Sequence, residues 1–394
     1  MNFILFEDAT VNDLLPFTFM RALCDIRIGI LTLREKWEKH LNTSVSILTR
    51  DYLQKKYPLN FNDKSDSILI NSTICPDEDL IKLINALRPG EAISDEKSII
   101  VLYPKAQQIV HDNNKINIDE KVWTTKPNIT YNALRIEKTW DLFTKNEEAI
   151  KKDFQFLSKG KKSQKLSETN RAINPDAIFI EEGAKVEHAI LNASTGPIYI
   201  GKAAEIMEGA MIRGPFALCE HATIKMGTKI YGATTVGPYS KVGGELSNSV
   251  IFGYSNKAHD GFLGNSVIGE WCNLGADTNN SNLKNNYSNV KVWSYASASF
   301  VDSGLQFCGL FLGDHSKTAI NTMFNTGTVV GISANIFGAG FPDKYIPSFS
   351  WGGTGELKKY QLDKALETAK RAYERRNKLF DETEEGIFKR LYLL

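Results

Sequence analysis

Residues 200–242 decide the fold, and they read IGKAAEIMEGAMIRGPFALCEHATIKMGTKIYGATTVGPYSKV. Within this stretch an aliphatic side chain returns at every sixth position without a miss. The positions are Ile200, Ile206, Ile212, Leu218, Ile224, Ile230, Val236 and Val242. A helix has a period near 3.6 residues and an exposed strand has a period of 2, so neither element explains this repeat. The spacing is typical of a solenoid built from hexapeptide repeats.

Small or short residues follow most of these aliphatics by four positions. Examples are Ala204, Ala210 and Thr228, and Phe216 is the bulky exception. We interpret each hexad as one flat side of a triangular coil, with the aliphatic residue inside the prism and the small residue near the corner. Coils of this kind stack at strand spacing, about 4.8 Å. The repeat predicts a left-handed parallel β-helix, an exception to the usual right-handed crossover. The alternative, a β-sandwich with regular strands, would rarely give eight consecutive repeats.

The remaining sequence predicts further segments. Residues 1–150 alternate short β-rich runs (3–6, 45–48, 67–70 and 99–102) with helical runs (28–41 and 77–87), which indicates an α/β, Rossmann-like domain. Residues 151–172 are polar and basic and are expected to form a solvated linker, with a phosphate-binding patch as the alternative. The β-helix is expected over residues 173–350. Residues 354–394 carry pairs such as Glu367 with Arg371 and Glu374 with Lys378, which predicts a C-terminal helix covering the last coil.

Composition narrows the classes of function. The 394 residues include 47 Lys and Arg against 46 Asp and Glu, a net charge of +1, so no global field favours nucleic acid or an anionic membrane. The sequence has no apolar run of membrane-spanning length and no signal-like start, so we expect a soluble, cytoplasmic protein. Five scattered cysteines without a C-x-x-C pair fit reduced thiols better than a disulfide framework or a zinc site.

The clean repeat breaks after Val242, and residues 255–289 become polar. The break contains His259, Phe262-Leu263-Gly264, Ile268-Gly269, Asn273-Leu274-Gly275-Ala276 and Asn282 in an ungapped register. This pattern resembles the acetyltransferase half of the bifunctional N-acetylglucosamine-1-phosphate uridyltransferase/glucosamine-1-phosphate acetyltransferase family.

The resemblance implies a role for each matched residue. His259 matches the catalytic base, while Phe262, where the family usually has Tyr, Asn273 and Asn282 match residues that contact the amino-sugar phosphate. Lys241 ends a segment, residues 236–241, that resembles a phosphate-facing stretch of the family. The family arginine that follows has no counterpart here, so Lys257 and Arg213 are the further phosphate-binding candidates.

Two later segments, residues 310–318 and 331–340, resemble the coils that hold acetyl-CoA in this family. By position, Gly313 and Gly338 are the expected coenzyme-binding residues. A histidine is well suited to the chemistry, because an amine that attacks a thioester must lose a proton near neutral pH. The alternative for His259 is a packed corner residue, and the asparagines could form hydrogen-bond ladders along the coils.

The N-terminal segment resembles the opening of a sugar-1-phosphate nucleotidyltransferase, most clearly at Leu14-Leu15-Pro16-Phe17-Thr18. Two departures predict a diverged domain of doubtful activity. The loop at residues 7–13 has no glycine to let the backbone approach a phosphate, and Thr73 stands where this superfamily has a Mg²⁺-binding Asp. If the domain uses an NTP and Mg²⁺, the phosphate-binding candidates are Arg21, Arg27 and Lys36, and the weak metal-ligand candidates are Asp8 and Asp25. Alternatively, Arg21 and Arg27 pair with Asp25 and Glu35.

The leading hypothesis is an acetyl-CoA-dependent N-acetyltransferase that acts on an amino-sugar 1-phosphate in nucleotide-sugar biosynthesis of the UDP-N-acetylglucosamine type. We expect a homotrimer in which neighbouring prisms form the site. One alternative is a non-catalytic sugar-nucleotide sensor or scaffold. Another is a metal-dependent hydratase, which requires a His-x-x-x-x-His pair that His188, His221, His259 and His315 do not form.

Overall fold

The computed structural model describes residues 1–394 except 60–65, 106–107, 113–114, 119–121, 123–126 and 128. The chain forms two compact units. The first unit consists of residues 1–14, 20–26 and 31–137, and the second consists of residues 15–19, 27–30 and 138–394.

The first unit contains a six-stranded sheet in the order β10-β6-β7-β5-β1-β4. Its strands are β1 (Asn2–Phe6), β4 (Ser46–Leu48), β5 (Ser67–Asn71), β6 (Glu91–Ser94), β7 (Ile99–Tyr103) and β10 (Ile129–Thr130), and a separate hairpin comprises β8 (Ile109–Asp112) and β9 (Lys115–Ile118). Strand β1 pairs in parallel with β4 and β5, whereas β7 is antiparallel to β5 and β6. The mixed sheet and its helices confirm the α/β prediction.

The helices of the first unit are α1 (Leu33–Leu41), α2 (Asp51–Gln54) and α3 (Glu78–Ala86), with the 3₁₀ turns η1 (Ala9–Asn12) and η2 (Leu23–Asp25). The expected helix over residues 28–41 starts later, at Leu33. Thr32 and Glu35 form a reciprocal capping box there, and residues 27–28 and 31–32 are the short strands β2 and β3.

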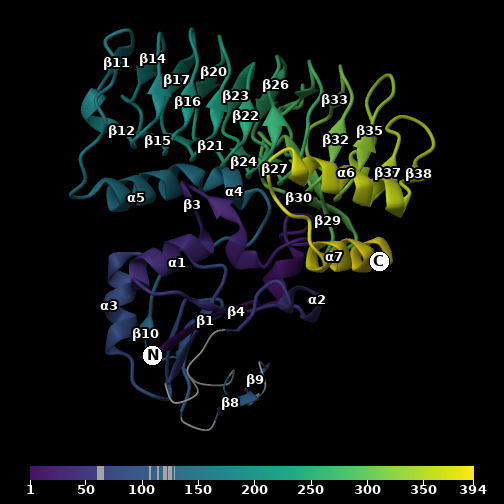
Figure 1. The fold of residues 1–394 in the computed structure, drawn as a ribbon. Coiled ribbons are helices and arrows are strands. Elements are labelled where there is room, and N and C mark those ends of the chain that lie inside the picture. The colour runs from purple at the N-terminus through teal and green to yellow at the C-terminus, as the bar shows by residue number, and fades with distance from the viewer. Residues whose placement is uncertain (60–65, 106–107, 113–114, 119–121, 123–126, 128) are drawn as a thin grey trace. The chain divides into compact units, whose positions relative to one another are not determined.

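From residue 138 onward the second unit contains α4 (Asp141–Thr144) and α5 (Asn146–Ser158) and continues into a left-handed parallel β-helix of about ten turns (Figure 1). Its three faces are three ladders of short strands. The first face is β11 (Arg171–Ile173), β14 (Ile190–Asn192), β17 (Met211–Arg213), β20 (Lys229–Tyr231), β23 (Glu245–Ser247) and β26 (Phe262–Gly264).

The second face is β12 (Ile178–Ile180), β15 (Ile198–Ile200), β18 (Phe216–Leu218), β21 (Thr234–Val236), β24 (Val250–Ile251), β27 (Val267–Ile268), β31 (Leu310–Leu312), β34 (Thr328–Val330) and β36 (Tyr345–Ile346). The third face is β13 (Lys185–Val186), β16 (Glu205–Ile206), β19 (Thr223–Ile224), β22 (Lys241–Val242) and β25 (Asn256–Lys257), then β32 (Lys317–Thr318), β35 (Asn335–Ile336), β37 (Ser350–Trp351) and β38 (Lys358–Lys359). Strands β28 (Asn279–Asn280) and β33 (Met323–Phe324) form a further parallel pair.

The hexad prediction is confirmed inside the prism. None of the eight aliphatic positions between Ile200 and Val242 is more than 2% exposed, and all eight belong to one buried cluster. Burial of this aliphatic column is the main stabilising contribution that the repeat makes.

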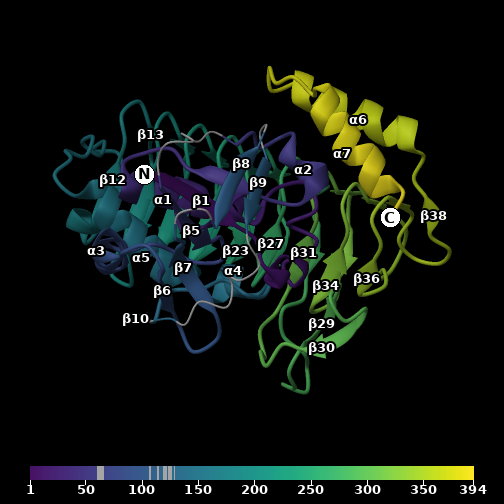
Figure 2. The same ribbon diagram turned by 90° about the horizontal axis from the view of Figure 1, so that it is seen from below.

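The sequence did not predict an antiparallel hairpin, β29 (Lys291–Ser294) and β30 (Ser299–Asp302), which interrupts the coils and projects beyond them (Figure 2). The structure also corrects the expected linker over residues 151–172. Helix α5 extends to Ser158, and Gln164 and Asn170 already bond to the first coil, through Gln164 N–H to the Ile180 carbonyl (2.8 Å) and Asn170 Nδ2 to the Val186 carbonyl (2.7 Å).

The C-terminal region contains two helices where the sequence predicted one. Helix α6 (Leu362–Glu374) and helix α7 (Glu382–Tyr392) lie side by side (Figure 2). The chain turns between them, where Asn377 adopts a left-handed conformation and Asp381 caps α7 by accepting two backbone N–H bonds. The Glu367–Arg371 pair is confirmed at 2.6 Å, but α6 ends at Glu374, and Lys378 instead lies over the ring of Tyr254. In the part of the chain that the structure describes, no helix combines the length and apolar character needed to cross a membrane.

Candidate functional site

His259 lies at the corner where the chain passes from the third face (β25) to the first face (β26). The residue is exposed and lines an open cavity of about 610 Å³. The other lining residues are Lys225, Met226, Gly243, Gly244, Ala258, Asp260, Ala276 and Asp277. The imidazole is therefore accessible from outside the prism, as a catalytic base would need to be.

Lys257 is placed differently from the sequence expectation. It pairs in register with Val242, points to the aliphatic column and is only 2% exposed. Its ammonium donates to the carbonyls of Gly243 (3.3 Å), His259 (2.6 Å) and Asp260 (3.0 Å). Burial lowers the pKa of Lys257 to about 8, although the nearby acids act in the opposite direction. This position is at odds with a phosphate-binding role and suits a group that holds the His259 corner in place.

Lys241 and Asn273, two residues expected to contact substrate, meet in a second cavity of about 490 Å³ on the third face. Ala258 lines both this cavity and the one that contains His259, so the two cavities adjoin. The wall opposite the coils is the end of α6. The remaining lining residues are Tyr254, Asn256, Trp271, Cys272, Lys317, Ala372, Arg375 and Arg376.

Phe262 and Asn282 lie outside this cavity, on the adjacent first face of the β-helix. Both side chains flank Gly264 of the first face, where they would contact a β-carbon on that glycine. The Phe262 N–H donates to Asn279 Oδ1 (2.8 Å), and Asn282 Nδ2 donates to Asn265 Oδ1 (2.8 Å). The single chain therefore brings together His259, Lys241 and Asn273, and places Phe262 and Asn282 on the adjacent face. The further candidate Arg213 is exposed on the first face in β17.

The two glycines expected at the coenzyme site lie in later coils. The N–H of Gly313 is used within the coil ladder, where it donates to the Val330 carbonyl (2.9 Å). Gly338 is exposed in the turn after β35 with φ of +125°, a conformation that favours glycine. As the structure describes them, neither lines a cavity with His259 or Lys241.

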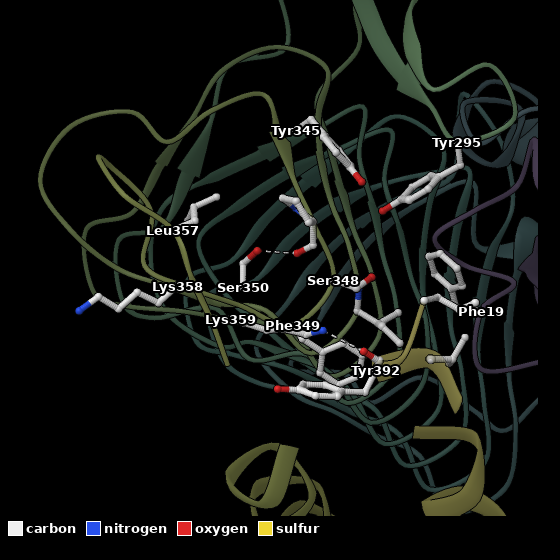
Figure 3. A pocket seen from close by; sticks show the side chains of 14 residues that line it. Phe19, Tyr295, Tyr345, Ser348, Phe349, Ser350, Leu357, Lys358, Lys359 and Tyr392 are labelled. Carbon is white, nitrogen blue, oxygen red and sulfur yellow. Dashed lines mark hydrogen bonds between the residues drawn. The ribbon is translucent and has the colours of Figure 1, made fainter. Parts of the chain in front are cut away.

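A third cavity of about 530 Å³ lies between the last coils and α7 (Figure 3). Tyr295 and Tyr345 direct their hydroxyl groups toward one another there, and the side chain of Lys358 points away from the cavity. Burial raises the pKa of Tyr295, so this phenol is neutral at ordinary pH. Among its lining residues in the described chain there is no site residue expected from the sequence.

The two carboxylates expected to bind a metal in the first unit have other partners. Asp25 forms an ion pair with Arg34 (Oδ1 to Nε, 2.7 Å) and accepts a hydrogen bond from the Tyr57 hydroxyl (2.8 Å). Asp8 accepts a hydrogen bond from Asn71 Nδ2 (2.7 Å) and caps η1. Within the described ranges no cluster of three or more His, Cys, Asp or Glu residues is arranged to hold a metal ion.

The three basic candidates are buried, and the structure does not group them in one unit. Arg21 and Lys36 belong to the first unit, whereas Arg27 belongs to the second. Arg27 donates through Nη1 to the Ile30 carbonyl and contacts Cys219 Sγ at 3.8 Å. Of the residues in the alternative pairing, Asp25 forms an ion pair with Arg34, and Glu35 takes part in the α1 capping box.

Sequence reasoning did not include Lys317, Arg375 and Arg376 among the site residues. A signal for Lys317 was present in the sequence, because residues 310–318 resemble a coil that holds acetyl-CoA. In the structure, Asn256, Asn273 and Lys317 occupy successive rungs of the third face. No comparable signal identified the arginines, since basic residues near the end of a helix are ordinarily surface residues that complement the helix dipole.

Comparison with known proteins adds two kinds of similarity. Residues 3–162 match the family model described as sugar nucleotidyl transferase. A bifunctional sugar-1-phosphate nucleotidylyltransferase/acetyltransferase of Sulfurisphaera tokodaii is 30% identical over 152 residues, covering 34% of this chain and 37% of that protein. The bifunctional protein GlmU of Methanococcus aeolicus is 28% identical over 271 residues, covering 68% of this chain and 55% of that protein.

The chain thus spans less than two thirds of the length of these curated relatives. Among solved structures, Arabidopsis UDP-N-acetylglucosamine acyltransferase aligns over 56% of this chain and 79% of that chain, with 16% identity and a TM-score of 0.24. The family model and the curated relatives show that this chain is similar to sugar nucleotidyl transferases and to GlmU-type bifunctional proteins, at low sequence identity.

Proposed function

We propose that the second unit is an acetyl-CoA-dependent N-acetyltransferase that acts on an amino-sugar 1-phosphate, with His259 as the general base. The observation that carries the proposal is the position of His259. It is exposed at a corner whose cavity adjoins the one lined by Lys241 and Asn273. In glucosamine 1-phosphate the amine and the phosphate are on neighbouring ring carbons, so the base and the phosphate-binding group must lie close together, and two adjoining cavities are compatible with that arrangement.

The thioester of acetyl-CoA supplies the acetyl group: the amine nitrogen bonds to the thioester carbonyl carbon, the C–S bond breaks, and CoA leaves as a thiolate. His259 accepts the proton that the amine loses as it attacks, and Lys241 holds the phosphate so that the amine is oriented toward the base. Lys257 fixes the backbone carbonyl of His259 from inside the prism and so limits the movement of the corner.

The experiment that tests this proposal is acetyl transfer from acetyl-CoA to glucosamine 1-phosphate by the wild type and by His259→Ala. Loss of a general base lowers the rate by roughly 10²–10⁴-fold, so we expect kcat to fall by at least a hundredfold. His221→Ala is the matched control, because His221 is also an exposed corner histidine and does not line either cavity. Equal rates in the wild type and His259→Ala would remove His259 from the role. Absence of transfer to a panel of amino-sugar phosphates would favour the sensor or scaffold alternative.

We propose in addition that the protein assembles as a homotrimer through the first face. This face exposes Ile173, Ile190, Met211 and Tyr231, each between 41% and 54% exposed. Ile190 and Met211 are register partners on adjacent strands and form an apolar pair, with Arg171 and Lys229 in the flanking rungs. Exposed apolar side chains on a flat ladder support packing against a second copy of the chain. In a trimer, Phe262 and Asn282, which lie on the same face, would approach a neighbouring subunit.

The first unit resembles a sugar nucleotidyltransferase by its family match. The carboxylates expected to hold Mg²⁺ do not fit that ion well, because Asp25 is already paired with Arg34 and Asp8 with Asn71. We therefore assign no nucleotidyl-transfer step to this unit. Release of pyrophosphate from UTP or dTTP in the presence of Mg²⁺ and a sugar 1-phosphate would overturn that assignment.

A further inference from the structure

The cavity on the third face has a cationic wall that the sequence did not predict. We call it the cationic pocket and define it by Lys241, Lys317, Arg375 and Arg376. The two lysines project from rigid coils. Strand β22 carries Lys241, which pairs with Asn256, and the next rungs bring in Asn273 and then Lys317. The two arginines come from the end of α6, on the opposite wall.

No carboxylate is among the residues that line this pocket in the described part of the chain. Lys317 donates to the neutral carbonyl of His315 (2.9 Å), and Arg376 Nη2 donates to the neutral amide oxygen of Asn256 (3.1 Å). Burial lowers the pKa of Lys317, and burial together with the charge of Arg375 lowers the pKa of Arg376. The neighbouring guanidinium groups of Arg375 and Arg376 therefore repel one another, and an anion beside them would relieve that repulsion.

The arginine wall is held in position by stacked rings. Tyr373, two residues before Arg375, stacks on Trp271 with ring centroids 3.9 Å apart. Trp271 in turn stacks on Tyr254 (4.3 Å), and Lys378 lies 5.7 Å above the Tyr254 ring. This contact anchors the end of α6, so the backbone that carries the two arginines is held against the coils.

We propose that Lys317, Arg375 and Arg376 complete, with Lys241, a binding pocket for a phosphate group. A planar guanidinium binds two phosphate oxygens at once, and a lysine adds a compact charge. The cavity volume of about 490 Å³ is of the size that small phosphorylated ligands occupy. The ligand is a phosphate ester, and it has two possible sources, the amino-sugar 1-phosphate or the phosphates of a CoA thioester. The choice between these sources rests on the proposed acetyltransferase function, whereas the phosphate site itself does not.

Titration calorimetry on the full chain tests the site without relying on catalysis. The probes are glucosamine 1-phosphate, glucosamine, CoA and dephospho-CoA, and the variant is Arg375→Gln combined with Arg376→Gln. Hydrogen bonds to charged groups are the stronger class, so we expect the variant to bind one of the phosphorylated probes at least about tenfold more weakly. Arg371→Gln is the matched control, because Arg371 lies one turn earlier on α6, pairs with Glu367 and does not line the pocket. Its affinities should equal those of the wild type.

The two sources give different results. If the pocket holds the sugar phosphate, the double variant weakens glucosamine 1-phosphate binding and leaves CoA binding unchanged. If it holds the coenzyme, CoA binding weakens instead, and a smaller difference between CoA and dephospho-CoA in the variant assigns the pocket to the 3′-phosphate. Lys241→Gln, on a rigid coil, provides the same test should the double variant unfold.

Wild-type protein that binds none of the phosphorylated probes, or variants that bind them as tightly as the wild type, would overturn the inference. Its failure is distinct from that of the proposed function. Acetyl transfer that depends on His259 but not on the arginines would support the proposed function and contradict the phosphate pocket. Phosphate binding that depends on the arginines, without acetyl transfer, would support the pocket and contradict the proposed function.

Discussion

At the residue scale, Lys257 occupies a position that aliphatic side chains fill elsewhere in the prism. A charged ammonium there is disfavoured by burial, which is why its folded pKa of about 8 lies below the ordinary value of 10.5. Below pH 8 the lysine is protonated in both the folded and unfolded chain. Between pH 8 and 10.5 the unfolded chain binds more protons, so the contribution of Lys257 to stability increases as pH rises.

We therefore expect the free energy of unfolding of the wild type to rise, relative to Lys257→Met, between pH 7.5 and pH 10. The upper limit of the change is about 3 kcal/mol, since each pKa unit corresponds to about 1.4 kcal/mol. Urea denaturation of both proteins at the two pH values measures it. Parallel pH profiles for the two proteins would show that the ammonium keeps its ordinary pKa in the fold.

At the scale of the element, each hexad buries one aliphatic side chain between coils that cannot relax independently. Ile212→Ala should lower the free energy of unfolding by about 2–5 kcal/mol, because the deletion leaves a cavity among close-packed neighbours. Ile190→Ala is the matched control on the same face, since Ile190 is 46% exposed and points outward. We expect its cost in the isolated subunit to be below about 1 kcal/mol. Equal losses in chemical denaturation would contradict the inward and outward assignment of these positions.

The α6–α7 pair makes a separate prediction, because Trp271 and Tyr373 join it to the coils. Tyr373→Ala should speed hydrogen exchange in residues 362–392 and leave exchange in the coil strands unchanged, since a stacked aromatic pair contributes about 0.5–1.5 kcal/mol beyond its buried area. Tyr373→Phe serves as the control, because it keeps the ring that stacks on Trp271 and removes only the hydroxyl. Unchanged protection in Tyr373→Ala would show that other contacts hold α6.

Elements differ in how far the sequence could predict them. The β-helix could be predicted from the hexads because each coil contacts only its neighbours. The pattern of buried positions is therefore local and repeats along the sequence. The break between α6 and α7 was not readable from composition, because helix-forming residues continue on both sides and the turn depends on the left-handed Asn377 and the Asp381 cap. The β29–β30 hairpin lies in a non-repeating insert, where no period exists to interpret.

At the scale of the whole molecule, the candidate site joins residues that are far apart in the chain. His259 and Asn273 were identified by a continuous motif, and Lys241 by a neighbouring one. Arg375 and Arg376 reach the same cavity only because α6 folds back on the third face, and that tertiary contact leaves no trace in local spacing. The sequence analysis expected Lys257 to bind phosphate, and the structure differs for a similar reason. After Val242 the inward positions are no longer six residues apart, so the spacing does not show that Lys257 takes the inward position opposite Val242.

The proposed trimer gives the prediction for the whole assembly. In the proposed trimer, an arginine at the apolar Ile190–Met211 pair of the first face would bury an unpaired charge between subunits, which costs several kcal/mol per contact. Met211→Arg should therefore convert a trimer into monomers in light scattering, with little change in the unfolding of the isolated chain, because Met211 is 44% exposed.

If a neighbouring prism completes the proposed substrate site, acetyl transfer should be lost with the trimer, since Phe262 and Asn282 lie on the same face. Leu379→Arg, at an exposed apolar residue between α6 and α7, should keep both the mass and the activity of the wild type. A wild type that sediments as a monomer would rule out the assembly. A monomeric Met211→Arg variant with full activity would show instead that one chain holds the entire site, with the cavity at His259 and the cationic pocket sufficient for both substrates.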